Sequence, residues 1–198
     1  MGLYTVVITG ASGSAYGLRL VEQLVLAGHE VAVTMTDAGR DVTSYELGFD
    51  LPMDEPANGM KGYLELGKDA PLRYASVNDL FDPIASGSHR VDGMVVAPAS
   101  MGFVGAIACG LAGNLPERAA DVMLKERRPL VLVPRETPFS VVHLRNLTSL
   151  AEAGAVILPA APAFYQRPQS LDDIVNFVVG KVLDVLGIDH ELFARWGE

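Results

Sequence analysis

The stretch Leu3-Tyr-Thr-Val-Val-Ile-Thr-Gly-Ala-Ser-Gly-Ser-Ala-Tyr-Gly17 carries the strongest fold signal in this chain. Residues 3–9 are a run of apolar and β-branched side chains, which predicts a buried strand. Residues 9–17 form a turn of small side chains that opens into a segment of helical period. A strand that passes through glycine directly into a helix is typical of the βα unit of a parallel sheet.

The alternation of short apolar runs with helical periods continues to the end of the chain. It predicts strands at 30–35, 93–97, 130–133 and 155–158, and helices at 15–27, 115–125, 141–153 and 170–186. Ser170 is the expected N-cap of the last helix, with Asp172 and Asp173 beside the positive end of its dipole. We therefore expect an α/β fold, a Rossmann-like three-layer α/β/α domain with a mainly parallel sheet. Residues 48–78 lack a clear period and are rich in proline, glycine and charge, so we expect a variable excursion there.

The length and composition suit a single packed domain. At 198 residues and 49% hydrophobic, we expect one domain over 1–186, followed by a C-terminal tail, 187–198, that contributes to the site or to a subunit contact. The sequence has no apolar run of about 18 residues and no basic segment before a hydrophobic one, so we expect no membrane span, no secretory signal and a cytoplasmic location. The single cysteine, Cys109, excludes an internal disulfide and a cysteine-based metal cluster, and we expect no metal site.

Positive charge gathers in one neighbourhood of an acidic chain. The net charge is −9 and the pI is about 4.9, which argues against nucleic acid as a partner. A local positive field on a negative protein instead predicts a small phosphorylated ligand. We expect Arg127 and Arg128 to be solvated charges at a helix end. The basic residues of this neighbourhood are Arg118, Lys125, Arg127, Arg128, Arg135 and Arg145.

Loops of small residues predict a ligand crevice at one edge of the sheet. The turn at 9–17 leaves backbone N–H groups unpaired at a helix N-terminus, where a phosphate or a flavin edge can approach. The alternative is a tight βα turn that needs glycine only for its backbone. Thr36 ends the second strand, and loops at 85–88 and 97–102 flank the strand at 93–97. Together these loops predict a mononucleotide-sized crevice whose small walls suit a flavin.

Longer motifs run through nearly the whole chain, and the longest surrounds the predicted strand at 130–133. They are Ile8-Thr-Gly-Ala-Ser-Gly13, Ile84-Ala-Ser-Gly-Ser88, Glu117-Arg-Ala-Ala-Asp-Val-Met-Leu-Lys-Glu-Arg-Arg-Pro-Leu-Val-Leu-Val-Pro-Arg-Glu-Thr-Pro138, Gly154-Ala-Val-Ile-Leu-Pro159, Phe164-Tyr-Gln-Arg-Pro-Gln169 and Arg195-Trp-Gly-Glu198. These motifs closely resemble the flavin prenyltransferase (UbiX-like) family.

The resemblance implies an enzyme that binds reduced FMN and joins the dimethylallyl group of dimethylallyl monophosphate to flavin N5 and C6. It implies that the product, prenylated FMN, serves a UbiD-type decarboxylase. It also implies a large homo-oligomer, a dodecamer, whose sites are shared between subunits.

The loops and the resemblance together predict which residues bind the two ligands. An allylic phosphate ionises when cations and hydrogen-bond donors stabilise its leaving group, and it has little need of a metal. The resemblance assigns the prenyl phosphate to Arg118, Lys125, Arg135, Tyr165 and Lys181. The expected flavin contacts are Gly10, Ala11, Ser12, Thr36, Ser86, Ser100, Met101, Gly102, Phe103 and Arg135.

Four residues are expected to carry the chemistry itself. Closing the new flavin ring removes a proton, and we expect Glu46 to accept it with help from Ser12. Glu136 is a further candidate, although it could simply pair with Arg135. Trp196, the sole tryptophan, could present its π face to the developing positive charge, or it could be an anchor packed on its own or a neighbouring subunit.

The sequence departs from the family pattern at four positions. Ala99 stands where cysteine is common, Phe103 where threonine is common, and Leu80 where some relatives carry tryptophan. Lys181 stands where the phosphate-binding arginine is expected, and lysine keeps the charge but loses the bidentate fork. We expect these changes to leave FMN binding intact and to affect the choice of prenyl donor or the catalytic efficiency.

Two other functions remain open at the level of sequence. An FMN-dependent cysteine decarboxylase would share the loop at 98–100 in part, but its usual continuation is missing and the basic residues would have no purpose. A non-catalytic flavin-binding partner would need only the loops. It would leave Glu46, Lys125 and Tyr165 without a role.

Overall fold

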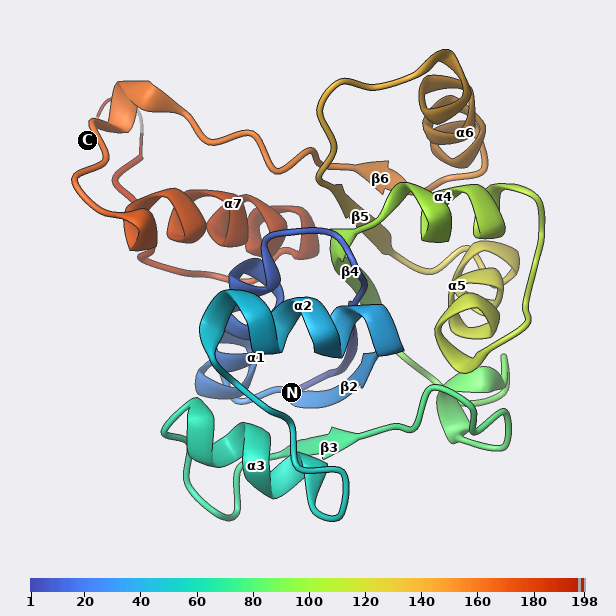
Figure 1. Cartoon of the computed structure of the whole chain (residues 1–198), viewed down its shortest axis with the longest axis horizontal. Coiled ribbons are helices and arrows are strands. Elements are labelled where there is room, and N and C mark those ends of the chain that lie inside the picture. The colour runs from blue at the N-terminus through green and yellow to red at the C-terminus, as the bar shows by residue number, and fades with distance from the viewer. Residues whose placement is uncertain (196, 198) are drawn as a thin grey trace.

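The computed structural model describes residues 1–195 and residue 197 (Figure 1). The strands are β1 (Leu3–Ile8), β2 (Glu30–Met35), β3 (Leu72–Tyr74), β4 (Gly93–Ala99), β5 (Leu130–Pro134) and β6 (Val156–Ile157). The helices are α1 (Ser14–Leu26), α2 (Asp37–Leu47), α3 (Pro56–Tyr63), α4 (Met101–Ala108), α5 (Leu115–Lys125), α6 (Val141–Glu152) and α7 (Leu171–Leu186), with short 3₁₀ helices η1 (Pro83–Ala85) and η2 (Phe164–Gln166).

The strands form a parallel sheet in the order β3-β2-β1-β4-β5-β6. β1 lies inside the sheet, where Val7 is paired with Thr34 of β2 and with Val96 of β4. From β1 the chain first moves outward through β2 and β3, and it then crosses back to build β4, β5 and β6 on the other side. Ligands of open α/β sheets bind at this point of reversal, outside the carboxyl ends of the strands.

Two hydrophobic clusters cover the two faces of the sheet. Val6 and Ile8 of β1 belong to the cluster that includes α1 and α7, whereas Val7 belongs to the cluster that includes α4, α5 and α6. Successive strand side chains point to opposite faces, so one strand supplies both layers. Figure 1 shows α4, α5 and α6 gathered on one side of the sheet and α1 and α7 on the other. The central strands are therefore buried on both faces.

The predicted α/β class and the parallel sheet are confirmed. The predicted helices and strands all exist, with ends that move by at most two residues: β4, for example, continues to Ala99 rather than 97. Ser170 caps α7 as expected by accepting a hydrogen bond from Asp173 N (3.1 Å).

The expectation of a variable excursion at 48–78 is wrong. This segment contains α3 and the edge strand β3, which are anchored by the fully buried Met60 and by Leu72 at 5% exposure. The short edge strand has too few residues to show a period. The sequence also failed to mark α2, which buries only Gly39 and Thr43, and α4, whose almost entirely apolar sequence shows no polar face.

Candidate functional site

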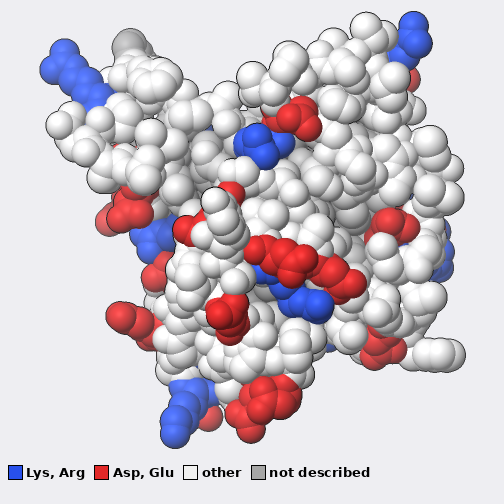
Figure 2. Space-filling view, in the orientation of Figure 1, with Lys and Arg blue, Asp and Glu red and all other residues white. Residues whose placement is uncertain are grey.

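The site predicted from the loops lies at the point where the strand order reverses. Here β1 leads into the turn before α1, β2 leads into α2, and β4 leads through Ser100 into α4. These helix N-termini point to one edge of the sheet, and their backbone dipoles favour an anionic ligand. In the same view the surface is hollowed above this edge, between the lobe that carries η2 and the lobe that carries α6 (Figures 1 and 2).

Glu46, at the end of α2, closes the N-terminus of α1. Its carboxylate accepts hydrogen bonds from Gly13 N (2.9 Å) and Ser14 N (3.1 Å), and the Ser12 hydroxyl also bonds to it. Burial raises the pKa of the Glu46 carboxyl, but these hydrogen bonds and the charge of Arg135 outweigh burial and hold the pKa below its ordinary value. The expectation that the turn leaves its N–H groups unpaired is therefore wrong for Gly13 and Ser14, because a carboxylate already occupies them.

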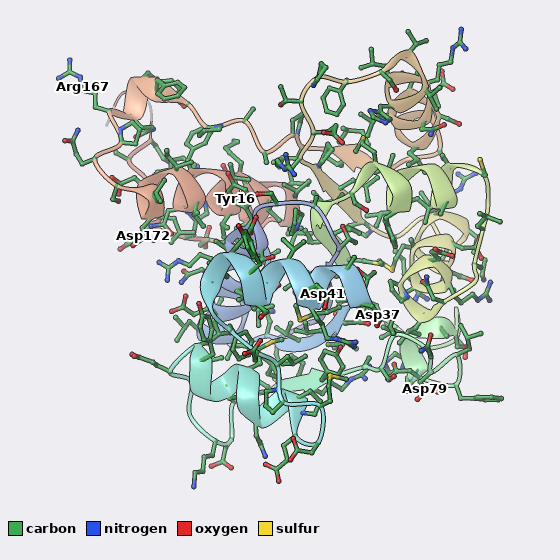
Figure 3. All side chains as sticks on the ribbon, viewed as in Figure 1. Tyr16, Asp37, Asp41, Asp79, Arg167 and Asp172 are labelled. Carbon is green, nitrogen blue, oxygen red and sulfur yellow. The ribbon has the colours of Figure 1, made fainter. Side chains whose placement is uncertain are left out.

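Arg135 lies near Glu46, directly after β5. Its Nε donates to the carbonyl oxygen of Ser12 (3.1 Å), so the guanidinium bridges the ends of β5 and β1. Tyr16 lies beside this group, above the start of α1 (Figure 3). Burial raises the pKa of the Tyr16 phenol, and the charge of Arg135 opposes that rise in part. Ser12, Glu46 and Arg135, three of the residues expected in the site, thus lie together, with Tyr16 as a neighbour that the sequence did not single out.

The loop after β4 forms the other wall of the crevice. Ser100 caps α4 by accepting a hydrogen bond from Phe103 N (3.3 Å), and Ser100 N donates to Thr9 Oγ1 (2.8 Å). A side chain at Gly102 would meet nothing within 4 Å, so there is open space beside the first turn of α4. The Phe103 ring is only 6% exposed and packs in the core, which leaves only its backbone to face a ligand.

Thr36 and Glu136 lie at the same edge of the sheet. Thr36 caps α2 by accepting a hydrogen bond from Gly39 N (3.0 Å). Gly10 approaches α2 so closely that a Cβ there would lie 2.6 Å from the Ala38 methyl group. Glu136 follows Arg135 and accepts a hydrogen bond from Thr137 N (3.0 Å).

Arg118, Lys125 and Ser86 lie away from this crevice within the same chain. Arg118 Nε donates to Ala85 O (3.1 Å) from α5, and Lys125 at the end of α5 is paired with Glu126. Lys125 precedes β5 whereas Arg135 follows it, so the length of a five-residue strand, roughly 16 Å, separates their backbones. The expectation that the loop at 85–88 shares the crevice edge is wrong, because this loop runs beside α5 toward the start of β4.

Tyr165 and Lys181 form a third group, on η2 and α7. The Tyr165 ring meets Phe177 edge-on, with ring centroids 6.2 Å apart. Lys181 donates to Asp184 Oδ2 (2.9 Å), one turn further along α7. Trp196, the fourth predicted catalytic residue, lies outside the described residues.

Asp184 bonds to three side chains and was not predicted from the sequence. Besides Lys181, its carboxylate bonds to His190 (3.2 Å) and Arg195 (3.1 Å), and so it ties the end of the chain to α7. Burial raises the pKa of the Asp184 carboxyl, but the bonds from Lys181, Arg195 and His190 lower it below its ordinary value. The only sequence signal was the i, i+3 spacing of Lys181 and Asp184 on one helix.

A cavity lies elsewhere, away from this crevice. It has a volume of about 370 Å³, lies between α1, α3 and α7 and is lined by Leu18, Arg19, Tyr63 and Asp172 among others. It contains none of the predicted site residues. The predicted crevice is instead an open groove, as Figure 2 shows. Among the described residues, no helix is long and apolar enough to cross a membrane, and no cluster of His, Cys, Asp and Glu has the make-up of a metal site.

The class of protein follows from comparison with known sequences: residues 4–183 match the model of the flavoprotein family. A flavin prenyltransferase UbiX from Halalkalibacterium halodurans is 49% identical over 197 residues, which covers 100% of this chain and 94% of that protein. This chain therefore belongs to the UbiX flavin prenyltransferase family. The resemblance seen in the sequence motifs is confirmed, and so is the predicted enzyme class, a prenyltransferase.

Solved structures agree with this assignment. The crystal structure of AnUbiX (PadA1) in complex with FMN and dimethylallyl pyrophosphate matches with a TM-score of 0.87 and 37% identity, and the match covers 100% of this chain and 98% of that one. A dodecameric FMN-dependent UbiX-like decarboxylase from Escherichia coli O157:H7 also matches with a TM-score of 0.87, at 36% identity over 99% of this chain and 100% of that one.

Proposed function

We propose that this protein binds reduced FMN in the crevice between β1 and β4 and joins a dimethylallyl group to flavin N5 and C6. The observation that carries the proposal is the contact between Ser12, Glu46 and Arg135 at this crevice. It brings a hydroxyl, an ionised carboxylate and a guanidinium to the place where the fold binds ligands. Membership of the UbiX family supports the same reading.

The residues of the crevice fit FMN. The converging N-termini of α2 and α4 suit its phosphate, and the open space at Gly102 lets a flat ring approach the backbone. Arg135 can hold the flavin edge while its Nε remains on Ser12. FMN is the prenyl acceptor, and in its reduced form it supplies the nucleophilic positions. The solved relative that contains FMN supports this assignment.

The cationic residues bind the phosphate of the donor. In the transfer, the bond between the prenyl carbon and the phosphate oxygen breaks, and the oxygen keeps the electron pair. Arg118, Lys125 and Lys181, with the Tyr165 hydroxyl, stabilise that charge, and no metal is required. We propose dimethylallyl monophosphate as the donor. The relative's complex contains the pyrophosphate, so the test below compares the monophosphate with the pyrophosphate as donors.

When the new ring closes, the double bond of the prenyl group would take up a proton as its carbon bonds to flavin C6, and Glu46 would receive the proton that C6 loses. Its lowered pKa keeps the carboxylate ionised at neutral pH, so it is ready to accept a proton. Its bond to Ser12 gives that proton a path from the crevice. Two backbone N–H groups hold the carboxylate in place, so the base is positioned before any ligand arrives.

The separation of the cationic groups supports a site that is completed by neighbouring copies of the chain. In one chain, Lys125 at the end of α5 lies a strand length away from Arg135, and Arg118 on the same helix is bonded to Ala85 O. We propose a homo-oligomer, a dodecamer, in which these groups meet across subunit contacts. The dodecameric relative supports this assembly. The product, prenylated FMN, would then pass to a UbiD-type decarboxylase.

The test is the mass of the flavin after a single anaerobic reaction. The protein is incubated with reduced FMN and either dimethylallyl monophosphate or the pyrophosphate, and the flavin is extracted for mass spectrometry. We expect a flavin heavier by one isoprene unit, formed faster from the monophosphate. An unchanged flavin with both donors, in protein shown to bind FMN, would reject the proposal.

A further inference from the structure

Thr9 joins the two walls of the crevice at its floor. It follows β1 directly, is 1% exposed, and faces the segment Pro98–Ser100. Its hydroxyl donates to Pro98 O (2.7 Å) and accepts a hydrogen bond from Ser100 N (2.8 Å). Thr9 N also donates to Pro98 O (3.3 Å). A single buried side chain therefore fixes the loop after β1 against the loop after β4.

The regular pairing of the two strands ends before this point. The last paired residues of β1 and β4 are Val7 and Val96, so beyond them the Thr9 contacts take the place of the ladder. On its other side β4 is held by β5, because Ala99 pairs with Pro134 and Arg135 N donates to Ala99 O (3.4 Å).

These contacts close into a ring around the crevice. Thr9 holds Pro98 and Ser100, the neighbouring Ala99 holds the Arg135 backbone, and the Arg135 guanidinium returns to Ser12, three residues after Thr9. The Thr9 hydroxyl is the link that sets the distance between the β1 side and the β4 side. A hydroxyl has one donor and two acceptor positions, and here the donor and one acceptor are both used.

We propose that Thr9 is a positioning residue for the flavin: its hydroxyl sets the width of the crevice and the place of Arg135 and Ser100. Removing the hydroxyl leaves Ser100 N–H without its acceptor, and the loop after β4 must move to find another. This inference rests on the proposed FMN site.

The chain provides a matched control on the same strand. Thr5 is also 1% exposed, lies four residues before Thr9 and therefore points to the same face of the sheet. Within the described part of the chain, Thr5 Oγ1 has no hydrogen-bond partner. Thr5→Val and Thr9→Val make the same chemical change in two buried sites, but only the second breaks hydrogen bonds at the crevice.

The experiment measures FMN affinity and the visible circular dichroism of bound FMN in folded wild type, Thr9→Val, Thr9→Ser and Thr5→Val. We expect Thr9→Val to weaken FMN binding by about tenfold, the equivalent of about one hydrogen bond, and to change the spectrum of the bound flavin at saturation. Thr9→Ser, which keeps the hydroxyl, should recover both properties, and Thr5→Val should match wild type.

The outcomes separate this inference from the proposed function. If the wild type fails to bind FMN, the proposed site is wrong. If the wild type binds and Thr9→Val binds equally well with the same spectrum, Thr9 serves stability alone and the inference is overturned. Equal losses in Thr9→Val and Thr5→Val would also overturn it. Should Thr9→Val not fold, Thr9→Cys, which keeps only a weakly bonding thiol, is judged by the same criteria.

Discussion

Glu46 shows how one side chain serves both the fold and the site. Its carboxylate caps α1 through Gly13 N and Ser14 N and also receives the Ser12 hydroxyl. A base held by backbone donors does not have to be ordered when the ligand binds, and this preorganisation is what catalysis by a positioned group requires. Lys181 is the opposite case. It is partly exposed and its ammonium is paired with Asp184, so in our proposal the donor phosphate has to compete with Asp184 for it.

At this scale the first prediction is that Glu46→Gln separates binding from ring closure. Glutamine keeps the size of the side chain but cannot accept the proton, so FMN and the donor should still bind. We expect an adduct joined only at N5, or a stall before it. Because that adduct and the ring-closed flavin have the same mass, NMR of the extracted flavin, which shows whether the C6 proton is retained, distinguishes them. Glu152→Gln, an exposed change on α6, is the control. Full turnover by the Glu46 variant would remove Glu46 from the mechanism.

The second prediction concerns the lysine that replaces the family's arginine. Lys181→Arg restores a bidentate fork and should tighten dimethylallyl monophosphate by up to about tenfold. Lys181→Ala should weaken the donor far more than FMN, because the proposed contact is to the prenyl phosphate alone. Equilibrium binding of each ligand measures both effects. Unchanged donor affinity in Lys181→Ala would place this lysine outside the site, as a partner of Asp184 only.

At the scale of elements, the crevice is built by helices that start where strands end. Thr36 caps α2, Ser100 caps α4, and Glu46 from the end of α2 closes the start of α1. Each cap satisfies backbone N–H groups that a helix end leaves without partners. The contact of Glu46 with α1 also joins two elements that are remote in sequence, and it depends on the charge of a carboxylate.

The third prediction is an acid-sensitive contact between α1 and α2. The pKa of Glu46 is lower in the folded protein than its ordinary value of 4.5, so the carboxylate stabilises the fold above that value. That stabilisation is lost as the pH falls through the lowered pKa. Thermal unfolding of wild type and Glu46→Gln should therefore differ most at neutral pH and converge in acid. A difference that stays constant from neutral to acid pH would show that the charge of Glu46 has no part in the contact.

The sequence predicted the elements with strong periods and missed those with weak ones. Buried strands such as β1 and β5 show as apolar runs, and Ser170 identified the start of α7. The segment with α3 and β3 was missed because a three-residue edge strand and a helix containing Gly59 and Gly62 give little signal.

Only part of the candidate site could be predicted from the sequence. Glu46 and Arg135 were assigned to one site with Ser12 only because of the family resemblance, since no spacing rule joins residues so far apart. The placement of the loop at 85–88 at the crevice edge was an avoidable error. In a parallel sheet, a loop that precedes one strand leads to the edge opposite the one where loops follow strands. Thr9 and Asp184 were missed because what distinguishes them is their hydrogen bonds to residues of other segments, which no sequence pattern reveals.

On the scale of the whole molecule, the predicted site residues fall into three groups. One lies at the crevice, one on α5, and one on η2 and α7. The charges in Figure 2 are dispersed over this face, with acidic side chains more numerous than basic ones, so this face does not gather the cations that a phosphate needs. A closed oligomer can bring different surfaces of identical chains together at every site. The central claim is therefore that each prenyl transfer uses the crevice of one copy of the chain and the α5 cations of another copy.

The most direct test is complementation between two inactive variants, Glu46→Gln and Arg118→Ala, unfolded together and refolded as mixed oligomers. Each variant alone should form no more than a trace of the ring-closed flavin, as measured by the loss of the C6 proton signal in NMR of the extracted flavin. If Glu46 and Arg118 of one site come from different copies, random mixing in equal amounts should restore about a quarter of the wild-type activity. Mixed oligomers that stay as inactive as the separate variants would contradict the claim.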